Sequence, residues 1–485
     1  MTTASTAAAD VRARFALIWV IPIVLGGLVS LAPPILNDGD TFWHIAAGRW
    51  MIEHLAVPRA DPFSYTFAGR PWVAHEWLSE VAMAGAYRAA GWPGVMLLTG
   101  AAVGALAALM NAWLLRWLLP LSAVLTLALG LACVAPGMLA RPHLLVLPLL
   151  ALWTILMLRA REENRAPPLW AALLLALWAN LHSSFIVGLL IAAALALEAL
   201  LDFKAWRRRS LIGWALFLGA SPVGALATPH GIEGLAFPLK VLSMRTLPAI
   251  TEWQGPDFLK PSPLEIALLA GLFFAFWRGV RLTAVRAAIV LGLLHMSLQH
   301  VRQELLLGVV APLVLAEPLA RALGRPGAVR ASWRLPLPQS LIAGALVAAF
   351  AAARLVTPQV RVDGPTAPIT ALAHAPPELR RLPVLNDYDF GGYLIFQGVR
   401  PYIDGRADMY GDAFVADDDK IQHNDPAATD AALARYGVRW AILPPRFYLT
   451  QRLESLAGWS KLYVDNTAAV LVYTPPPTPS APPPG

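Results

Sequence analysis

Two acidic residues follow the first apolar stretch of the chain, in the sequence LNDGDTFWH. Asp38 and Asp40 come just before residues 41–55, whose apolar side chains recur with helical periodicity. A carboxylate in this place can accept backbone N–H groups and cap the helix. It can also take a proton from a hydroxyl group as a general base, or bind a metal ion. His44 follows Asp40 by one helical turn and could orient its carboxylate.

Short turns between the other apolar stretches carry further histidines, arginines and acids. His75-Glu76 begins like the zinc motif H-E-x-x-H, but the second histidine is missing, which excludes a zinc protease. The guanidinium of Arg141 fits a phosphate, and equally a lipid head group. Glu252-Trp253 sets an acid beside an aromatic ring, which suits a sugar and also an interfacial anchor. The full set of predicted substrate-binding residues is His44, His75, Glu76, Arg141, His143, His182, Glu252, Trp253, His300 and Arg302.

Further members of this set have plain alternatives. His75 and Glu76 also fit an interfacial histidine and an acid in the first turn of a helix. His182 lies in the polar turn NLHSSF, where close packing of small residues is the competing interpretation. His300 and Arg302 could bind a phosphate or extend their polar ends to the membrane surface. The single cysteine, Cys133, excludes an intramolecular disulfide and a cysteine-based metal site. We assign no residue as a metal ligand from the sequence.

The segments that must position these residues are too apolar for a soluble protein. Hydrophobic residues make up 57% of the 485 residues and charged residues 14%, whereas soluble domains carry about 25% charged residues. A membrane span needs about 20 mostly apolar residues. Eleven candidate segments lie near 15–36, 93–115, 120–137, 143–159, 168–183, 185–202, 211–228, 263–277, 283–298, 303–320 and 338–356. The sequence thus predicts a mainly α, polytopic membrane protein.

Basic residues predict the orientation of this bundle. If the spans alternate in direction, the N-terminal Arg12 and Arg14 share one side with Arg116, Arg161 and Arg286. The positive-inside rule assigns that side to the cytoplasm. Nearly all histidines before residue 357 then fall on the outer side, so polar residues of unrelated loops converge on one face. The net charge of +7 is explained by the inner loops, and we predict no nucleic-acid partner.

The composition also predicts the domain boundaries. Residues 1–356 form the bundle, including a first external loop at 37–76, and residues 357–475 form a small external α/β domain. The Pro-rich tail 476–485 is expected to be disordered. In the loop we expect juxtamembrane helices at 41–55 and 75–91, with the tryptophans of the first at head-group depth. In the α/β domain we expect strands at 382–387, 400–406, 437–443 and 460–475, and helices at 390–398 and 428–437.

One turn of this domain allows two interpretations. Asp404 and Arg406 follow the predicted strand at 400–406, where α/β domains place ligand sites. Asp-Gly-Arg is equally a common turn sequence.

The whole arrangement resembles the GT-C superfamily of integral membrane glycosyltransferases. More narrowly, it is similar to a bacterial family of uncharacterised GT-C-type proteins. The segments that carry the resemblance are DGDTFWHIAAGRWMIEHLAVPRADPFSYTFAGRPWVAHEWLSE, NLHSSFIVGL, TPHG, TEW and YDFGGYLIF…YIDGRADMYG. The resemblance implies a GT-C-like bundle and an acid of the first external loop as catalytic base. That acid is Asp40, which abuts the predicted helix, or Asp38.

The resemblance also implies the reaction partners. The donor would be a polyprenyl-phosphate or polyprenyl-diphosphate sugar within the membrane lipid, with Arg141, His300 and Arg302 near its phosphate. The acceptor would be an unknown glycan, lipid or protein. No cofactor is required, although some members use a divalent cation such as Mg²⁺ or Mn²⁺. The location would be the bacterial inner (cytoplasmic) membrane, with a cytoplasmic N-terminus and a periplasmic C-terminal domain.

Two other classes of protein compete with this interpretation. A polytopic transporter predicts repeated halves with interrupted spans, and ionisable residues in the middle of the membrane. This sequence has no internal repeat, and its acids lie near the ends of the predicted spans, as Glu198 and Glu317 do. The third class is a non-catalytic membrane scaffold whose external domain binds a partner.

Overall fold

The computed structural model describes residues 16–202, 208–325, 337–423 and 425–475. Arg12 and Arg14, predicted to be cytoplasmic, and the predicted disordered tail 476–485 lie outside these ranges. The chain divides into two compact units, and each is treated by itself. The first comprises the residues up to 36, 75–242 and 247–359, and the second comprises 37–74, 243–246 and the residues from 360 onward.

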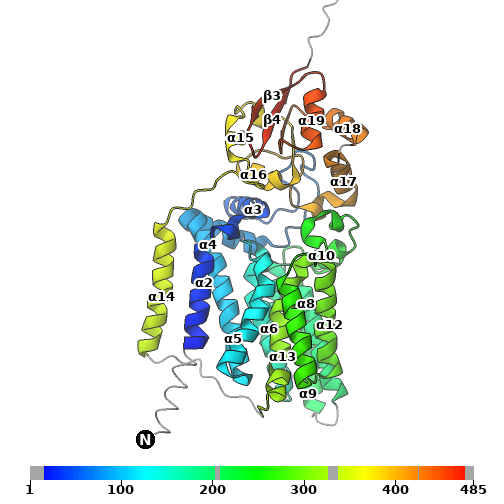
Figure 1. Cartoon of the computed structure of the whole chain (residues 1–485). Coiled ribbons are helices and arrows are strands. Elements are labelled where there is room, and N and C mark those ends of the chain that lie inside the picture. Colours follow the sequence, from blue (N-terminus) through cyan, green and yellow to red (C-terminus); the bar gives the residue numbers. More distant parts are fainter. Residues whose placement is uncertain (1–15, 203–207, 326–336, 424, 476–485) are drawn as a thin grey trace, which may run out of the picture. The chain divides into compact units, whose positions relative to one another are not determined.

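The first unit is a bundle of apolar helices, as predicted. A helix overlaps each of the eleven predicted segments: α2 (Ile21–Leu31), α4 (Trp77–Trp117), α5 (Pro120–Val134), α6 (Pro142–Glu162), α7 (Ala172–Leu181), α8 (Phe185–Leu201), α9 (Arg208–Ala225), α11 (Pro263–Arg278), α12 (Ala284–Gln299), α13 (Glu304–Ala322) and α14 (Leu337–Val356). Many of them run alongside one another (Figure 1). Among the described residues, five helices are long and apolar enough to cross a membrane, and several shorter apolar helices accompany them. The chain is therefore a polytopic helical membrane protein.

Helix α4 joins the predicted juxtamembrane helix to the second span. Its backbone leaves the helical conformation at Ala90 and Gly91, where Gly91 adopts a φ of 61°. Glycine accepts this left-handed conformation without steric cost, and Pro93 then fixes the start of the next helical segment. The predicted boundary at residue 91 is thus confirmed as a break within one long helix.

Glycines let helices α2 and α4 touch along their backbones. A Cβ atom at Gly100 would lie 2.4 Å from the carbonyl oxygen of Gly26, and one at Gly26 would lie 2.5 Å from that of Gly100. Without a hydrophobic driving force between helices in lipid, such close approach supplies packing energy. Gly130 of α5 and Gly308 of α13 meet in the same reciprocal way, with each added Cβ 2.6 Å from the other carbonyl oxygen.

We expect Gly100→Leu to force α2 and α4 apart. Overpacking a tight contact costs about 1–3 kcal/mol, and here backbone atoms stand in the way and cannot turn aside. The measurement is the melting temperature of the detergent-purified protein. Gly85→Leu on the same helix is the matched control, because nothing lies within 4 Å of a Cβ atom at Gly85. Equal melting temperatures for the two variants would contradict the proposed contact.

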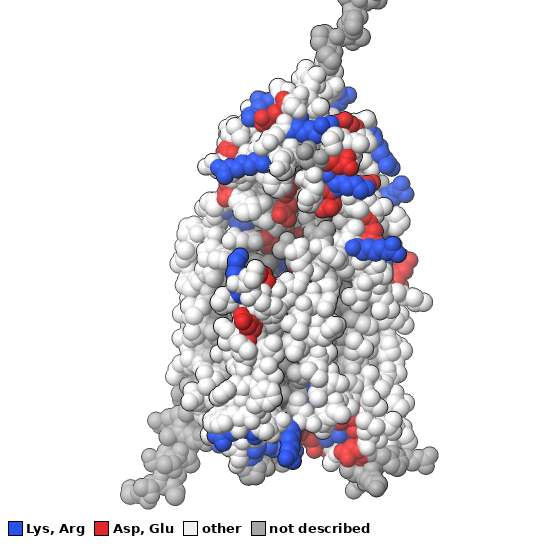
Figure 2. All heavy atoms as spheres, turned by 45° about the vertical axis from the view of Figure 1, so that its right-hand side comes forward, with Lys and Arg blue, Asp and Glu red and all other residues white. Residues whose placement is uncertain are grey.

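Ion pairs join the helix ends on the side predicted to be cytoplasmic. Arg116 pairs with Glu162 at 2.7 Å, and Arg161 pairs with Glu198 at 2.7 Å. Arg286 at the start of α12 pairs with Glu317 at 2.8 Å. Residues predicted to share one side therefore do share one end of the bundle. Figure 2 shows charged side chains gathered at this end, below a helical surface that is almost free of charge on the side in view.

The second unit contains a four-stranded sheet in the order β1-β2-β4-β3. β1 (Val384–Asn386) is parallel to β2 (Trp440–Leu443), and β4 (Ala469–Tyr473) is antiparallel to both β2 and β3 (Trp459–Val464). Its helices are α15 (Ile369–His374), α16 (Gly391–Phe396), α17 (Ala407–Gln422), α18 (Pro426–Tyr436) and α19 (Tyr448–Ser455). This confirms the predicted small α/β fold, and the single strand expected at 460–475 is in fact the hairpin of β3 and β4.

The predicted strand at 400–406 is wrong. Its residues run beside β1 without forming a ladder, because the side chain of Asn386 takes up their backbone groups. The Tyr402 N–H donates to Asn386 Oδ1 at 2.7 Å, and Asn386 Nδ2 donates to the carbonyl oxygen of Ile403 at 2.8 Å. Pro401, which has no N–H, cannot donate a ladder bond.

Helix α3 (Asp40–His54) packs within the second unit. Phe42 meets the rings of Tyr393 and Phe396 edge to face, with centroids 5.2 Å and 5.5 Å away. Trp43 is also buried. The ring of Trp72, from the same unit, lies 6.4 Å from that of Trp43. The expectation that the tryptophans of this helix lie at head-group depth stays a prediction. The sequence grouped residues 37–76 with the bundle, whereas the contacts of 37–74 group them with the C-terminal residues.

A buried ionic cluster ties this loop to the C-terminal residues. Arg406 donates from Nε and Nη2 to the two oxygens of Asp404, and from Nη1 to Asp61, each at 2.7 Å. The Tyr410 hydroxyl donates to Asp404 at 2.7 Å. The charged side chains of Asp61, Asp404 and Arg406 are 0% exposed. Of the two interpretations of this turn, the structure favours a structural role over a ligand site.

Candidate functional site

The end of the bundle opposite the ion-paired end carries a group of charged and imidazole side chains. They come from segments that are distant in the sequence, and all were among the predicted substrate-binding residues. Glu76 precedes α4, Arg141 precedes α6, and His182 follows α7. Glu252 lies on the short helix η7 (Thr251–Trp253) and Arg302 on η8 (Val301–Gln303).

Glu252 bridges two arginines at the centre of this group. Arg141 Nη1 lies 2.6 Å from Glu252 Oε2, and Arg302 Nη1 lies 2.5 Å from Glu252 Oε1. Burial by itself would raise the pKa of Glu252, but Arg302 and Arg141 outweigh it and lower this pKa to about 2. The carboxylate is therefore ionised at every pH at which the protein would work.

His182 connects Glu76 with Arg302. The Ser184 backbone N–H donates to His182 Nδ1 at 3.0 Å, so the neutral ring must carry its proton on Nε2. His182 Nε2 lies 3.2 Å from Glu76 Oε1 and 3.5 Å from Arg302 Nη2. Burial lowers the pKa of His182 to about 3, with Glu76 acting in the opposite direction. The imidazole is therefore a neutral donor toward Glu76.

This shift predicts a pH dependence of stability. Unfolded His182 binds a proton as the pH falls through about 6.5, whereas the folded protein resists protonation until about 3. The stability from neutral His182 is therefore complete above the unfolded pKa and is lost progressively toward acid. We expect His182→Gln to show a smaller drop in melting temperature between pH 7 and pH 5 than the parent protein. An equal drop would contradict the assignment.

Residues that the sequence reasoning did not single out hold this end in place. Trp77 Nε1 donates to Asn180 Oδ1 at 2.7 Å, and Ser79 Oγ donates to the carbonyl oxygen of Leu181 at 2.8 Å. Asn180 Nδ2 also reaches the carbonyl oxygen of Ala227 at 2.8 Å. The first turn of α4 is thereby pinned to the end of α7. The polar motif NLHSSF could have pointed to Asn180, which is its first residue.

The remaining predicted members surround this centre. His143 Nε2 lies 2.9 Å from the carbonyl oxygen of Gly137, and its ring is 6.3 Å from that of His182. His300 Nδ1 donates to the carbonyl oxygen of Trp253 at 2.6 Å, and the Arg302 guanidinium lies over the Trp253 ring at 5.5 Å. These contacts fix η7 against η8.

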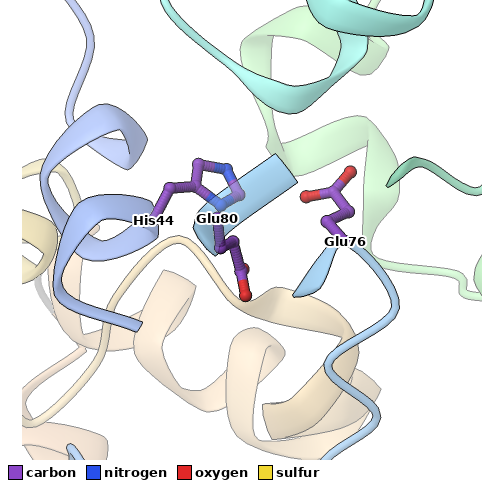
Figure 3. Close-up of side chains that lie close together, drawn as sticks. All are labelled: His44, Glu76 and Glu80. Atoms are coloured by element: carbon purple, nitrogen blue, oxygen red, sulfur yellow. The ribbon is translucent and has the colours of Figure 1, made fainter. Parts of the chain in front are cut away.

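His75 and Glu76 begin the polar edge of α4. The His75 ring stacks on Phe237 of α10 (Ile232–Leu242) with centroids 3.9 Å apart, and His75 Nε2 lies 3.4 Å from Glu76 Oε1. Glu80, which the sequence reasoning missed, follows Glu76 by one turn. A carboxylate oxygen of Glu76 and one of Glu80 lie within 4.8 Å of each other, and Figure 3 shows both side chains. Such a pair of oxygens could contribute ligands to a divalent cation.

The two candidate bases and His44 belong to the second unit. Asp38 Oδ2 accepts hydrogen bonds from the backbone N–H and the hydroxyl of Thr41, both at 3.2 Å, as a helix-capping carboxylate does. Asp40 Oδ1 accepts from the indole N–H of Trp43 at 2.9 Å. The His44 ring lies against the Trp43 ring at a tilt of 35°, with centroids 3.7 Å apart. Trp43 is therefore a residue that orients Asp40, and the orienting role of His44 stays a prediction.

The Asp40 carboxylate also lies directly against the backbone of Gly405. A Cβ atom at Gly405, in the Asp-Gly-Arg turn, would lie 1.8 Å from Asp40 Oδ1. Gly392 likewise lies against the carbonyl oxygen of Gly39, 2.2 Å from an added Cβ. The glycines of the motifs YDFGGY and YIDGR thus allow close approach of the segment that carries Asp40.

No family model and no curated protein matches this chain. Among solved structures it is similar to ArnT from Cupriavidus metallidurans bound to undecaprenyl phosphate, with 14% sequence identity and a TM-score of 0.54 over 93% of this chain and 96% of that chain. It is also similar to the apo oligosaccharyltransferase of Archaeoglobus fulgidus, with 12% identity and a TM-score of 0.49 over 87% and 69% of the two chains. The likeness to ArnT shows that this chain has the predicted GT-C fold.

Proposed function

We propose that this membrane protein with a GT-C fold is a glycosyltransferase that takes its sugar from a polyprenyl-phosphate or polyprenyl-diphosphate donor. The observation that carries the proposal is the pair of arginines, Arg141 and Arg302, that meet on one carboxylate at one end of the bundle. Two guanidiniums directed at one anionic group are a phosphate-binding arrangement. The similar structure of ArnT was determined with undecaprenyl phosphate, which contains such a group.

In the proposed reaction the arginines bind the donor phosphate and Asp40 acts on the acceptor. The acceptor hydroxyl oxygen attacks the anomeric carbon while Asp40 takes the hydroxyl proton. The bond between that carbon and the phosphate oxygen breaks, and its electron pair leaves with the phosphate, whose charge the arginines stabilise. A single displacement of this kind inverts the anomeric configuration. The acceptor is a glycan, a lipid or a protein.

Asp40 is preferred over Asp38 as the base. Asp38 accepts both the amide and the hydroxyl of Thr41, which is the bonding of a cap. Asp40 has one oxygen oriented by Trp43 and is less deeply buried than Asp38. No cofactor is part of the proposal. A divalent cation, Mg²⁺ or Mn²⁺, would take Glu76 and Glu80 as ligands and would neutralise phosphate charge.

The proposal is tested with a panel of radiolabelled polyprenyl-phosphate and polyprenyl-diphosphate sugars. The purified protein is incubated in vesicles with each donor and with an extract of the bacterial envelope that supplies acceptors. We expect one donor to be consumed and its label to appear in an acceptor, and vesicles without the protein are the control. If no donor of the panel is consumed, the proposed function is wrong.

We also propose the orientation predicted from the charges, with the second unit in the periplasm of a bacterial inner membrane. Ser455 is exposed in the second unit, and Glu163 is half-exposed at the ion-paired end of the bundle. The native Cys133 is buried. We expect Ser455→Cys to react with a membrane-impermeant maleimide in intact cells, and Glu163→Cys only after lysis. The reverse pattern would contradict this orientation.

A further inference from the structure

We infer that Glu252 is a resident anion that occupies the phosphate site of the donor-free protein and is exchanged for one phosphate group. The inference rests on the proposed function and goes beyond it, because it concerns how the site is filled when no donor is bound. The sequence predicted Glu252 as a substrate-binding residue. The geometry points instead to a carboxylate that stands where the substrate phosphate will bind.

The shape of the contact supports this assignment. Arg141 Nη1 and Arg302 Nη1 each reach a different oxygen of the same carboxylate, at 2.6 Å and 2.5 Å. The two guanidiniums are thus spaced for two oxygens bonded to one central atom. A tetrahedral phosphorus offers the same pair of oxygens as a carboxylate carbon, so one phosphate group can replace Glu252 without moving the arginines.

The charges of the site support an exchange rather than an addition. The two arginines contribute two positive charges, and Glu252 neutralises one of them. The neighbouring His182 is neutral, and beyond it lies the negative Glu76. A phosphate added beside Glu252 would place two anions on one pair of guanidiniums and would suffer their repulsion. A phosphate in place of Glu252 leaves the charge of the site nearly unchanged.

The surroundings allow Glu252 to leave by rotation of its side chain. The Glu252 side chain is 30% exposed, whereas that of Arg141 is 13% and that of Arg302 is 26%. The backbone that follows is held, because His300 donates to the carbonyl oxygen of Trp253 and the Val301 N–H donates to that of Gln254 at 2.9 Å. The most exposed member of the trio is therefore the one that can turn toward water while η7 stays in place.

The test is the affinity of the purified full-length protein for farnesyl methyl phosphate, a prenyl phosphodiester with one negative charge. Removing a carboxylate that competes through two charged hydrogen bonds should strengthen binding, and we expect Glu252→Gln to bind about tenfold more tightly than the parent protein. Glutamine keeps the size of the side chain and its ability to accept a hydrogen bond. Glu233→Gln, an exposed glutamate on α10, is the matched control and should leave the affinity unchanged.

A second variant keeps the test decisive. Arg302→Gln should abolish the gain when it is combined with Glu252→Gln, because the phosphate then lacks one of its two guanidiniums. Melting temperatures show that each variant is folded. If Glu252→Gln binds as the parent does, or more weakly, Glu252 is not a competitor and the inference is wrong while the proposed function stands. If no variant binds the probe, both are wrong.

Discussion

Replacing Arg406 with methionine is expected to destabilise the second unit by about 3–5 kcal/mol, the usual cost of breaking a buried ion pair. Arg406 is 0% exposed and holds Asp61 and Asp404, which are equally buried. Without it, two carboxylates remain in the interior without a counter-charge. Chemical unfolding of the purified protein, followed by tryptophan fluorescence, measures the change. Trp72 and Trp440 report on this unit because both are buried in it.

Two further variants make this result specific. Arg400→Met, at an exposed position six residues earlier, should have little effect. Changing Asp61, Asp404 and Arg406 together to apolar residues should cost less than Arg406→Met alone, because no unpaired charge then remains. If Arg406→Met unfolds at the same denaturant concentration as Arg400→Met, the cluster does not hold the loop 37–74 in the second unit.

Replacing Asp40 with asparagine is expected to lower kcat for sugar transfer by about 10²–10⁴-fold, the usual contribution of a general base. Asparagine keeps the hydrogen bond from Trp43 but cannot accept the acceptor proton. The KM for the donor should change little, since the arginines and not Asp40 bind its phosphate. The measurement is the initial rate of transfer at saturating donor.

Two variants test whether the loss of kcat comes from the Asp40 carboxylate. Gly405→Ala keeps the carboxylate but adds a Cβ atom where Asp40 Oδ1 lies, so it should also lower kcat. Asp417→Asn, at an exposed position on α17, is the control. A larger loss in Asp38→Asn than in Asp40→Asn would transfer the role of base to Asp38.

Hydropathy and charge were enough to predict the helical bundle and the end at which its polar residues gather. Arg141, His182 and Arg302 lie in different turns, and counting spans placed all three on one side. That prediction succeeds because a span reverses the chain each time, so the side of a turn depends only on how many spans precede it. The contact of Glu252 with two arginines could not be predicted, because the number of preceding spans gives the side of a turn but not its distance from other turns.

The features that the sequence could not predict depend on contacts between residues that are far apart in the chain. Asp61 and Arg406 are 345 residues apart in sequence, and their ion pair is one of the contacts that join the first loop to the C-terminal residues. Phe42 suits a membrane surface as well as a protein core, and its contacts with the rings of Tyr393 and Phe396 show that it packs inside the protein. The strand expected at 400–406 failed because one side chain, Asn386, satisfied its backbone.

The most direct test of the central claim compares donor consumption by the parent protein and by an Arg141→Gln, Arg302→Gln double variant. Both are assayed in the same vesicles with the radiolabelled donor that the parent consumes. We predict that the double variant loses at least about 100-fold in kcat/KM, since each charged hydrogen bond to phosphate contributes about 1.5–3 kcal/mol. Equal consumption by a folded double variant, or no consumption by the parent, would contradict the claim that this end of the bundle is the donor site of a glycosyltransferase.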